Sequence, residues 1–345
     1  MTTKTTSLVP LAIPVYKKII SLFPQNYFRF CFAYGSGVLK QGGVSVDKKP
    51  MVDMIFVVDD SEGFHSQNLY MNPHHYSFLK YGGHKLITTI QEKWPAKVYF
   101  NTLIPFKEEG ITFKYGVVNR NDLINDLLDW DYLYLSGRLH KPVKFIDQPP
   151  KDIATALRQN LFSALHAALI ILPEVFTERE MYKTIANLSY NGDFRMIFGE
   201  DKNKVSNIID KQVPEFRKLY RPLLKTLDDY VEIPDNEPVD QVCMQDISPL
   251  SRMYHLFQLP KIPQKQLINY WRLHVSWRRR DAEDILKNIA NNLDLGEIFS
   301  DCLKTVVFKS SIEQSLKGVF TAGLLKSIKY SNKKIVKMVK AREKM

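Results

Sequence analysis

The sequence is poor in cysteine and has no long uncharged apolar run. Its three cysteines, Cys31, Cys243 and Cys302, lie far apart and form no CxxC pair, so neither a disulfide framework nor a zinc knuckle is indicated. This usage fits a reducing compartment. The longest uncharged apolar stretch, residues 161–173, contains His166 and is too short to span a bilayer. We therefore expect any membrane attachment to be peripheral, and we expect no secretory signal.

Two common phosphate-binding motifs are also missing. The chain has no GxxxxGK[ST] sequence of a Walker A loop, and the GSGVLK stretch that starts at Gly35 lacks the third glycine of a dinucleotide fingerprint. The following residues, 41–50, contain Gly42, Gly43 and Pro50, which exclude the crossover helix of a dinucleotide-binding unit. The glycine loop must therefore belong to another kind of site.

Acidic residues are scarce at both ends of the chain. The first is Asp47, and such acid-poor leaders occur in mitochondrial presequences, although this one has little arginine. The net charge is +11, and residues 302–345 hold eleven basic residues against two acidic ones. The excess charge is therefore concentrated in the tail and indicates a polyanionic partner.

Within that tail, lysines recur every three or four residues from position 324 onward, opposite a row of apolar residues. This spacing predicts a basic amphipathic helix that binds an anionic bilayer surface, although a helix packed on its own domain would show the same pattern. The expected membrane-binding residues are Lys326, Lys329, Lys333, Lys334 and Lys337.

The glycine loop lies between two strand-like apolar runs, residues 28–33 and 51–58. Gly35, Ser36 and Gly37 would let the backbone approach the β and γ phosphates of a nucleotide, and Asp53 in the second run would bind a metal ion. A DNA polymerase beta-like nucleotidyltransferase usually carries two carboxylates on this strand, but Ile55 occupies the second position. A plain strand turn, with Asp53 satisfied by local hydrogen bonds, remains the alternative.

Further basic residues follow in the same region. We expect residues 97–104 and 111–119 to pair as strands. Lys114 lies within the second strand, where its side chain either reaches the sheet edge or faces a phosphate. Arg138 and Lys141 lie beside Gly137, where they could bind triphosphate oxygens or form a surface turn.

The pattern predicts an α+β protein of three domains. Residues 1–148 form the nucleotidyltransferase domain, a mixed sheet with helices, and the prolines at 149 and 150 mark its end. Residues 149–230 form a small helical, winged-helix-like domain, with a capping box at Thr177 and Glu180 and a strand-like link at 194–198. Residues 231–345 form a mainly helical region, which begins with a linker at 231–248.

Several segments together resemble the mitochondrial phosphatidate cytidylyltransferases, also called mitochondrial translocator assembly and maintenance proteins. The resemblance covers nearly the whole chain, and its more specific motifs are SGRLHKPVK at 136–144 and GDFRM at 192–196 with GEDKNKV at 199–205. The other matching segments are YGSGV, VDMIFVVDD, NPHHYSFLK, KYGV and FTAGLLKSIKYSNKKIVKM.

The resemblance implies an Mg²⁺-dependent enzyme that makes CDP-diacylglycerol from CTP and phosphatidate for cardiolipin synthesis. It implies a peripheral protein on the matrix side of the mitochondrial inner membrane, with no nucleic acid partner. Ile55 is then a family trait. Two other readings stay open: a related enzyme acting on nucleic acid, and a membrane-associated assembly factor whose catalytic core has decayed.

We expect the active site in the cleft between the first two domains. The expected catalytic residues are Asp53, which also binds the metal, and Asp193, which could instead only start a turn. The expected nucleotide- and phosphate-binding residues are Tyr34, Gly35, Ser36, Gly37, Lys114, Arg138, Lys141 and Arg195.

Overall fold

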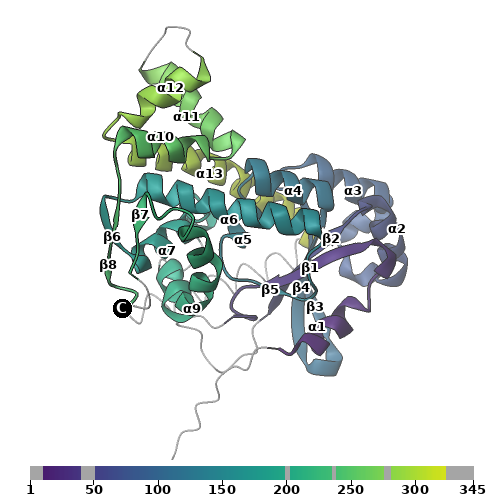
Figure 1. The fold of residues 1–345 in the computed structure, drawn as a ribbon. Helices are drawn as coiled ribbons and strands as arrows, with labels where there is room; N and C mark the ends of the chain where they lie inside the picture. Colours follow the sequence, from purple (N-terminus) through teal and green to yellow (C-terminus); the bar gives the residue numbers. More distant parts are fainter. Residues whose placement is uncertain (1–10, 40–50, 199–202, 235–237, 276–280, 324–345) are drawn as a thin grey trace, which may run out of the picture.

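A computed structural model of the protein describes residues 11–39, 51–198, 203–234, 238–275 and 281–323. The expected membrane-binding lysines, from Lys326 to Lys337, lie outside the described residues. The first half of the chain forms a sheet with helices on both faces, and the second half is mainly helical (Figure 1). The predicted α+β class is confirmed. None of the described helices is long and apolar enough to cross a bilayer.

The main sheet is mixed and has the strand order β3-β4-β2-β1-β5. Strands β1 and β2 pair antiparallel, β2 and β4 pair parallel, and β3 and β4 pair antiparallel, as expected for that last pair. The strands are β1 (Phe28–Tyr34), β2 (Val52–Val58), β3 (Val98–Phe106), β4 (Ile111–Asn119) and β5 (Lys144–Phe145).

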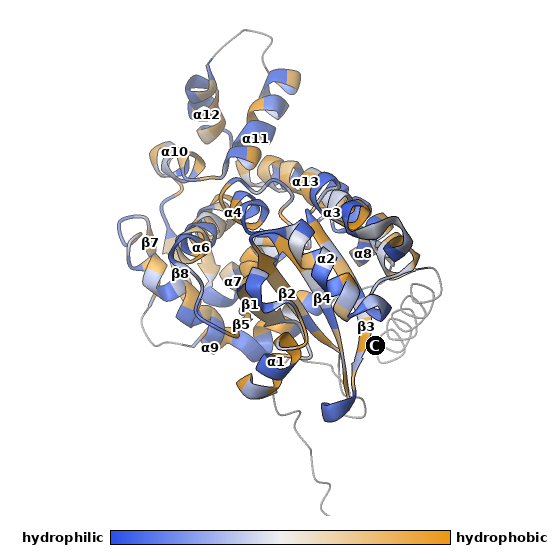
Figure 2. Cartoon of the chain, turned by 90° about the vertical axis from the view of Figure 1, so that its right-hand side faces the viewer, coloured by the Kyte–Doolittle hydropathy of each residue, from blue (hydrophilic) through white to orange (hydrophobic). Residues whose placement is uncertain are grey.

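Alternate residues of β2 face two separate cores, because successive side chains in a strand point to opposite faces. Met54 and Phe56 pack with α1 and α2, whereas Ile55 and Val57 pack with α4 and α6. The apolar strands are visible between these helices in Figure 2. The helices of this half are α1 (Ile13–Ile20), α2 (Ser61–Met71), α3 (Gly83–Lys93), α4 (Arg120–Asp129) and α5 (Ser136–Leu139), with 3-10 turns η1 (Gln25–Tyr27), η2 (Pro73–His75), η3 (Phe78–Gly82) and η4 (Lys107–Glu109).

The second half packs around the long helix α6 (Lys151–Ile171). The capping box at Thr177 and Glu180 is confirmed at the start of α7. The remaining elements are α7 (Glu178–Asn187), α8 (Phe194–Phe198), α9 (Lys204–Leu224), α10 (Pro249–Phe257), α11 (Lys261–His274), α12 (Ala282–Ala290) and α13 (Leu295–Ala322), with β6 (Val175–Thr177), β7 (Val231–Glu232) and β8 (Val242–Gln245).

Two local predictions in this half are wrong. The strand-like link at 194–198 is the helix α8, because the Asp193 carboxylate accepts a hydrogen bond from the Arg195 backbone N–H and starts a helical turn. The expected linker at 231–248 contains β7 and β8, and β8 pairs with both β6 and β7. Gln245 of β8 is buried, and its side-chain amide donates to carbonyls at the end of α6, including that of Leu172. These hydrogen bonds satisfy carbonyl groups that the end of the helix leaves without an intrahelical partner.

Helix α13 connects the two halves, and Figure 1 shows it running from the helical half toward the sheet. Lys317 is fully buried, and its Nζ donates to the carbonyl oxygens of Gln91 (3.2 Å) and Trp94 (3.4 Å) at the end of α3. The Ser77 hydroxyl donates to the Phe320 carbonyl oxygen at 2.9 Å. The last described helix is therefore part of the scaffold of both halves.

Candidate functional site

A pocket lies where the glycine loop, α5, the α7–α8 turn and α13 meet. It contains about 760 Å³ of empty space, including the part that opens to solvent. Its wall includes Tyr34 and Gly35 from the sheet, Ser189 and Asp193 from the helical half, and Ser311 from α13. The pocket is thus built jointly by the two halves of the chain.

The glycine loop makes a close approach to Asp53. Gly35 has φ +85°, which strains other residues, and a Cβ there would lie 3.3 Å from Asp53 Oδ2. A Cβ on Gly37 would lie 2.4 Å from the Met51 carbonyl oxygen. Both positions therefore require glycine, and the loop is more constrained than a plain strand turn.

Asp53 itself is half-buried on β2 and is paired in register with Tyr34 on β1 and Lys114 on β4. Its carboxylate has no hydrogen-bond or ion-pair partner within the described part of the chain. The alternative in which local hydrogen bonds satisfy Asp53 is therefore not supported among these residues. An unpartnered carboxylate beside a glycine loop is suited to a metal ion.

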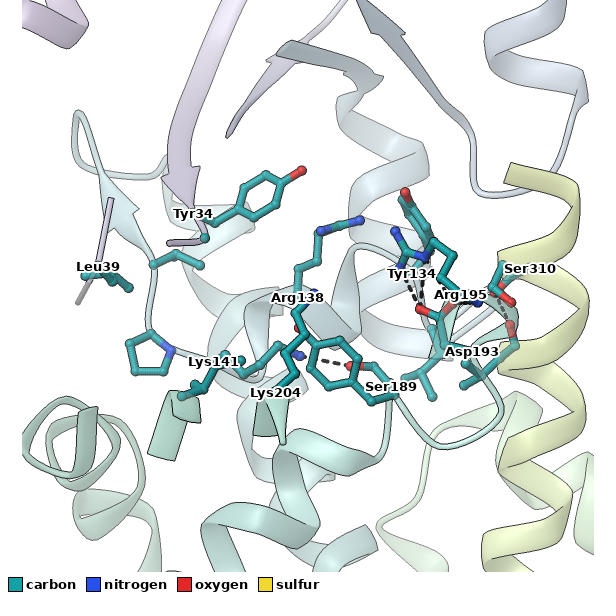
Figure 3. Close-up of a pocket in the computed structure, with 18 of the residues that line it drawn as sticks. Tyr34, Leu39, Tyr134, Arg138, Lys141, Ser189, Asp193, Arg195, Lys204 and Ser310 are labelled. Carbon is teal, nitrogen blue, oxygen red and sulfur yellow. Dashed lines mark hydrogen bonds and ion pairs between the residues drawn. The ribbon is translucent and has the colours of Figure 1, made fainter. Parts of the chain in front are cut away.

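Arg138 of α5 is the central cation of the pocket. Its guanidinium lies between the rings of Tyr34 and Tyr134, with its carbon 4.7 Å from each ring centroid (Figure 3). Its Nε is buried and has no hydrogen-bond partner in the described structure. A buried cation held by aromatic rings, with no ion pair to a carboxylate among the described residues, is prepared to bind an anion.

The short helix α5 is held in place by Asp126 of α4. The buried Asp126 carboxylate accepts hydrogen bonds at 2.9 Å from the backbone N–H groups of Tyr132, Leu135 and Ser136. On the other side, a Cβ on Gly137 would lie only 2.3 Å from Ser189 Cβ, so α5 packs closely against the helical half. These contacts fix the backbone from which Arg138 projects.

We expect Asp126→Asn to destabilise the protein by about 2 kcal/mol, because the amide nitrogen cannot accept the backbone hydrogen bonds that the carboxylate accepts. Chemical denaturation checks this value, with Asp129→Asn at the end of the same helix as the control, where a change within about 0.5 kcal/mol is expected. Equal stabilities of the two variants would show that Asp126 does not hold α5.

Lys141 and Lys204 approach the same wall of the pocket. Lys141 Nζ donates to the Gly137 carbonyl oxygen and to Ser189 Oγ at 2.9 Å, and it lies 4.9 Å from the Tyr190 ring centroid. Lys204 Nζ lies 5.2 Å from the same ring centroid. Burial and the neighbouring charges of Arg138 and Lys204 hold the pKa of Lys141 well below its ordinary value.

On the opposite side of the pocket, the buried Asp193 pairs with the partly exposed Arg195. Arg195 donates to Asp193 through its Nε at 3.0 Å and through a terminal nitrogen at 2.5 Å. Burial alone would raise the pKa of the Asp193 carboxyl, but the hydrogen bonds and charge of Arg195 outweigh burial and lower it. Asp193 is therefore ionised, and it both starts α8 and holds Arg195 at the pocket wall.

The electrostatic field of the pocket is positive. Burial raises the pKa of the Tyr134 phenol, but the cations Arg138, Arg195 and Lys114 outweigh this effect and leave it below its ordinary value. Lys114 Nζ also lies 4.0 Å from the Phe100 ring centroid. Four basic side chains line the pocket with one described carboxylate among them, so the site is suited to a polyanion.

The structure brings most of the predicted site residues together. Tyr34, Gly35, Arg138, Lys141, Asp193 and Arg195 line the pocket. Ser36, Gly37, Asp53 and Lys114 do not line it but lie in or beside the glycine loop and the adjoining strands. Six further lining residues are not among the predicted site residues: Tyr134, Ser189, Tyr190, Lys204, Ser310 and Ser311. Of these, only Lys204 has a signal in the sequence, because it is a basic residue within the GEDKNKV segment at 199–205.

A metal ion would find one suitable carboxylate at the loop. No group of three or more His, Cys, Asp or Glu side chains that could hold a metal exists among the described residues. Mg²⁺ nevertheless often binds through one or two carboxylates together with substrate phosphates and water. Asp53 fits that mode, whereas Asp193 is occupied by Arg195.

Comparison with known proteins gives one consistent result. A family model described as "Phosphatidate cytidylyltransferase, mitochondrial" matches residues 16–337. A protein of that name from Danio rerio is 44% identical over 326 residues, which are 94% of this chain and 94% of the relative. Proteins of the same name from Drosophila melanogaster and Caenorhabditis elegans are 41% and 36% identical, over 94% and 95% of this chain and 98% and 99% of their own lengths.

Proposed function

The chain belongs to the mitochondrial phosphatidate cytidylyltransferase family, and from this premise we propose that its pocket binds CTP and transfers the cytidylyl group to phosphatidate. The observation that carries the assignment of the site is the positive pocket next to the Gly35 loop and Asp53. The products are CDP-diacylglycerol and pyrophosphate. We further propose that this product serves cardiolipin synthesis.

The reaction is an in-line phosphoryl-type substitution. A phosphate oxygen of phosphatidate attacks the α-phosphorus of CTP, a new P–O–P bond forms, and the bond between the α-phosphorus and the bridging oxygen to the β-phosphorus breaks. The electron pair leaves with pyrophosphate, so negative charge develops on the leaving group. Positioning and charge neutralisation are what the protein must supply, and Arg138, Lys141 and Arg195 are placed to bind these oxygens.

We propose Mg²⁺ as the cofactor, with Asp53 as its protein ligand. The metal would neutralise charge on the phosphate oxygens and help to orient them. The glycine loop of Gly35, Ser36 and Gly37 binds phosphates through its backbone, and Asp193 acts at the opposite wall by positioning Arg195.

The lowered pKa of Lys141 gives the site a pH dependence. A bound triphosphate favours the charged amine, so CTP binding raises the pKa of Lys141. At pH values between the pKa of the free protein and that of the CTP complex, binding therefore takes up a proton. Affinity for CTP should therefore fall as pH rises through that range. The charged groups around the amine are Asp193, Arg195, Arg138 and Lys204. Titration calorimetry in buffers of different ionisation enthalpy measures the proton uptake.

The matched control for this effect is Lys141→Arg, because a guanidinium stays protonated throughout the range. We expect the proton uptake to disappear in this variant while CTP still binds. Equal uptake in both proteins would assign the proton to the nucleotide and not to Lys141.

We propose that the protein works on the matrix side of the mitochondrial inner membrane as a peripheral protein; its relatives are named as mitochondrial enzymes. The tail residues Lys326, Lys329, Lys333, Lys334 and Lys337 would bind anionic lipid headgroups.

Replacing Lys333, Lys334 and Lys337 by Glu tests the role of the tail. We expect binding to phosphatidate-containing vesicles to weaken at least tenfold, because each basic residue near an anionic surface contributes about 1 kcal/mol. Turnover on detergent-dispersed substrate should change much less. Unchanged vesicle binding would contradict the proposed contact.

The function itself is tested by pyrophosphate release. The purified protein with Mg²⁺ and phosphatidate vesicles should consume CTP in preference to ATP or GTP and form CDP-diacylglycerol. Transfer of nucleotides to RNA or DNA ends would favour an enzyme acting on nucleic acid. No turnover with any nucleotide would favour a non-catalytic assembly factor.

A further inference from the structure

The outer face of α13 changes from polar to apolar partway along the helix. One face of α13 is buried along its whole length, from Leu295 to Thr321. The opposite face carries exposed Glu297, Asp301 and Thr305 in the first half. From position 308 onward it carries the exposed apolar side chains Phe308, Leu316, Val319 and Phe320, here called the α13 stripe, together with the exposed Lys309. Leu316 is 59% exposed and has apolar neighbours along the helix, so the exposed apolar side chains form a row and are not scattered singly.

The stripe continues onto the sheet half of the molecule. The Phe320 and Trp94 rings meet edge to face at 6.3 Å between centroids, and Trp94 is 40% exposed. Phe78 follows Ser77, whose hydroxyl contacts the Phe320 carbonyl oxygen, and it is 54% exposed. An apolar surface therefore extends across the junction of the two halves.

The inner side of the same helix segment forms part of the pocket. Val307, Ser310 and Ser311 line the pocket, Phe308 of the stripe lies among them, and the other stripe residues follow one to three helical turns later. The stripe runs from position 308 to 320, about 18 Å at 1.5 Å per residue. Where the two overlap, at positions 307–311, the pocket wall and the stripe belong to one helix, whose diameter with side chains is about 10–12 Å.

We propose that the α13 stripe is the surface with which the enzyme contacts the lipid bilayer. The inference rests on the proposed function, which requires a substrate whose phosphate enters the pocket while its acyl chains stay in an apolar medium. The chain after Gly323 carries eight basic residues and one acidic residue at 324–345, so the stripe adjoins a segment with the charge that anionic lipids attract. An apolar surface next to basic residues is the combination that binds the membrane interface.

The test uses the full-length protein with Leu316→Glu and Val319→Glu combined. The control combines Leu273→Glu and Leu293→Glu, which add the same charge at leucines that are 73% and 88% exposed and lie outside the stripe. We expect binding to vesicles of phosphatidylcholine and phosphatidate to weaken at least tenfold for the stripe variant and less than twofold for the control. A Leu316→Gln and Val319→Gln variant, which adds no charge, should also bind more weakly, by at least threefold.

Turnover separates this proposal from the proposed function. The stripe variants should lose turnover on phosphatidate in vesicles but stay within twofold of wild type on a short-chain phosphatidate that is soluble in water. Absence of turnover in wild type would reject the proposed function, and vesicle binding would still decide the role of the stripe.

Three results would overturn the bilayer contact. Vesicle binding of the stripe variants equal to that of the control would exclude it directly. If the stripe variants still bind vesicles but their oligomeric state changes on gel filtration, the stripe contacts a second copy of the chain. If they still bind vesicles but their thermal stability falls and that of the control does not, the stripe packs within the chain.

Discussion

We expect Asp53→Asn to lower turnover by about a thousandfold or more while the protein stays folded. Asn has nearly the same shape, and among the described residues the Asp53 carboxylate has no partner that the change would break. The loss comes from removing a negative ligand for the metal, which is worth several kcal/mol at a reacting phosphate. Steady-state pyrophosphate release measures the effect.

A second measurement links this loss to the metal. For wild type, Mg²⁺ and CTP together should raise the thermal unfolding temperature more than CTP alone, and Asp53→Asn should remove this extra stabilisation. Asp147→Asn is the control, because Asp147 forms only an exposed ion pair with Lys17. If Asp53→Asn kept both turnover and the metal effect, the metal ligand would have to be sought elsewhere.

Arg138→Ala should weaken CTP binding by about 30-fold or more. Truncating one partner of a buried charged hydrogen-bonded pair costs about 2–5 kcal/mol, and the Arg138 guanidinium is buried between two tyrosine rings in the pocket wall. Titration calorimetry with CTP gives the dissociation constant. Arg158→Ala on the exposed side of α6 should leave it unchanged.

Stability distinguishes the binding role of Arg138 from a structural one. Removing Arg138 loses its contacts with Tyr34 and Tyr134 but also relieves repulsion from the neighbouring cations Arg195 and Lys141, so the free energy of unfolding should change by less than about 2 kcal/mol. Arg138→Lys keeps the charge but not the planar fork, so an intermediate loss of about tenfold in CTP affinity is expected. Unchanged CTP affinity together with a clear loss of stability would identify Arg138 as a structural residue.

The sheet and the glycine loop could be predicted from the sequence because their signals are local. Residues 52–58 are apolar on both faces apart from Asp53, which indicates a central strand, and the flanking glycines fix the turn. Once the two runs pair, Tyr34 lies opposite Asp53, so the position of the carboxylate beside Gly35 follows from strand geometry.

The remaining pocket wall could not be predicted, because it depends on contacts between distant residues. The Phe194 backbone N–H donates to Ser311 Oγ across 117 positions, and no local pattern indicates such a pair. The apolar run at 194–198 fits a strand or a helix equally well by its pattern. It forms a helix because the Asp193 carboxylate accepts a hydrogen bond from the Arg195 backbone N–H. Tyr134 and Ser189 likewise gain their roles only when α5 packs against the helical half.

The position of α13 also determines when the pocket can form during folding. Its wall at Val307, Ser310 and Ser311 comes from the end of the described chain, whereas Tyr34 and Gly35 come from its beginning. The sheet half can collapse early on its own local contacts, but the pocket closes only after nearly the whole chain is available. A protein that folds while its chain emerges progressively would therefore be unable to bind nucleotide until α13 has docked.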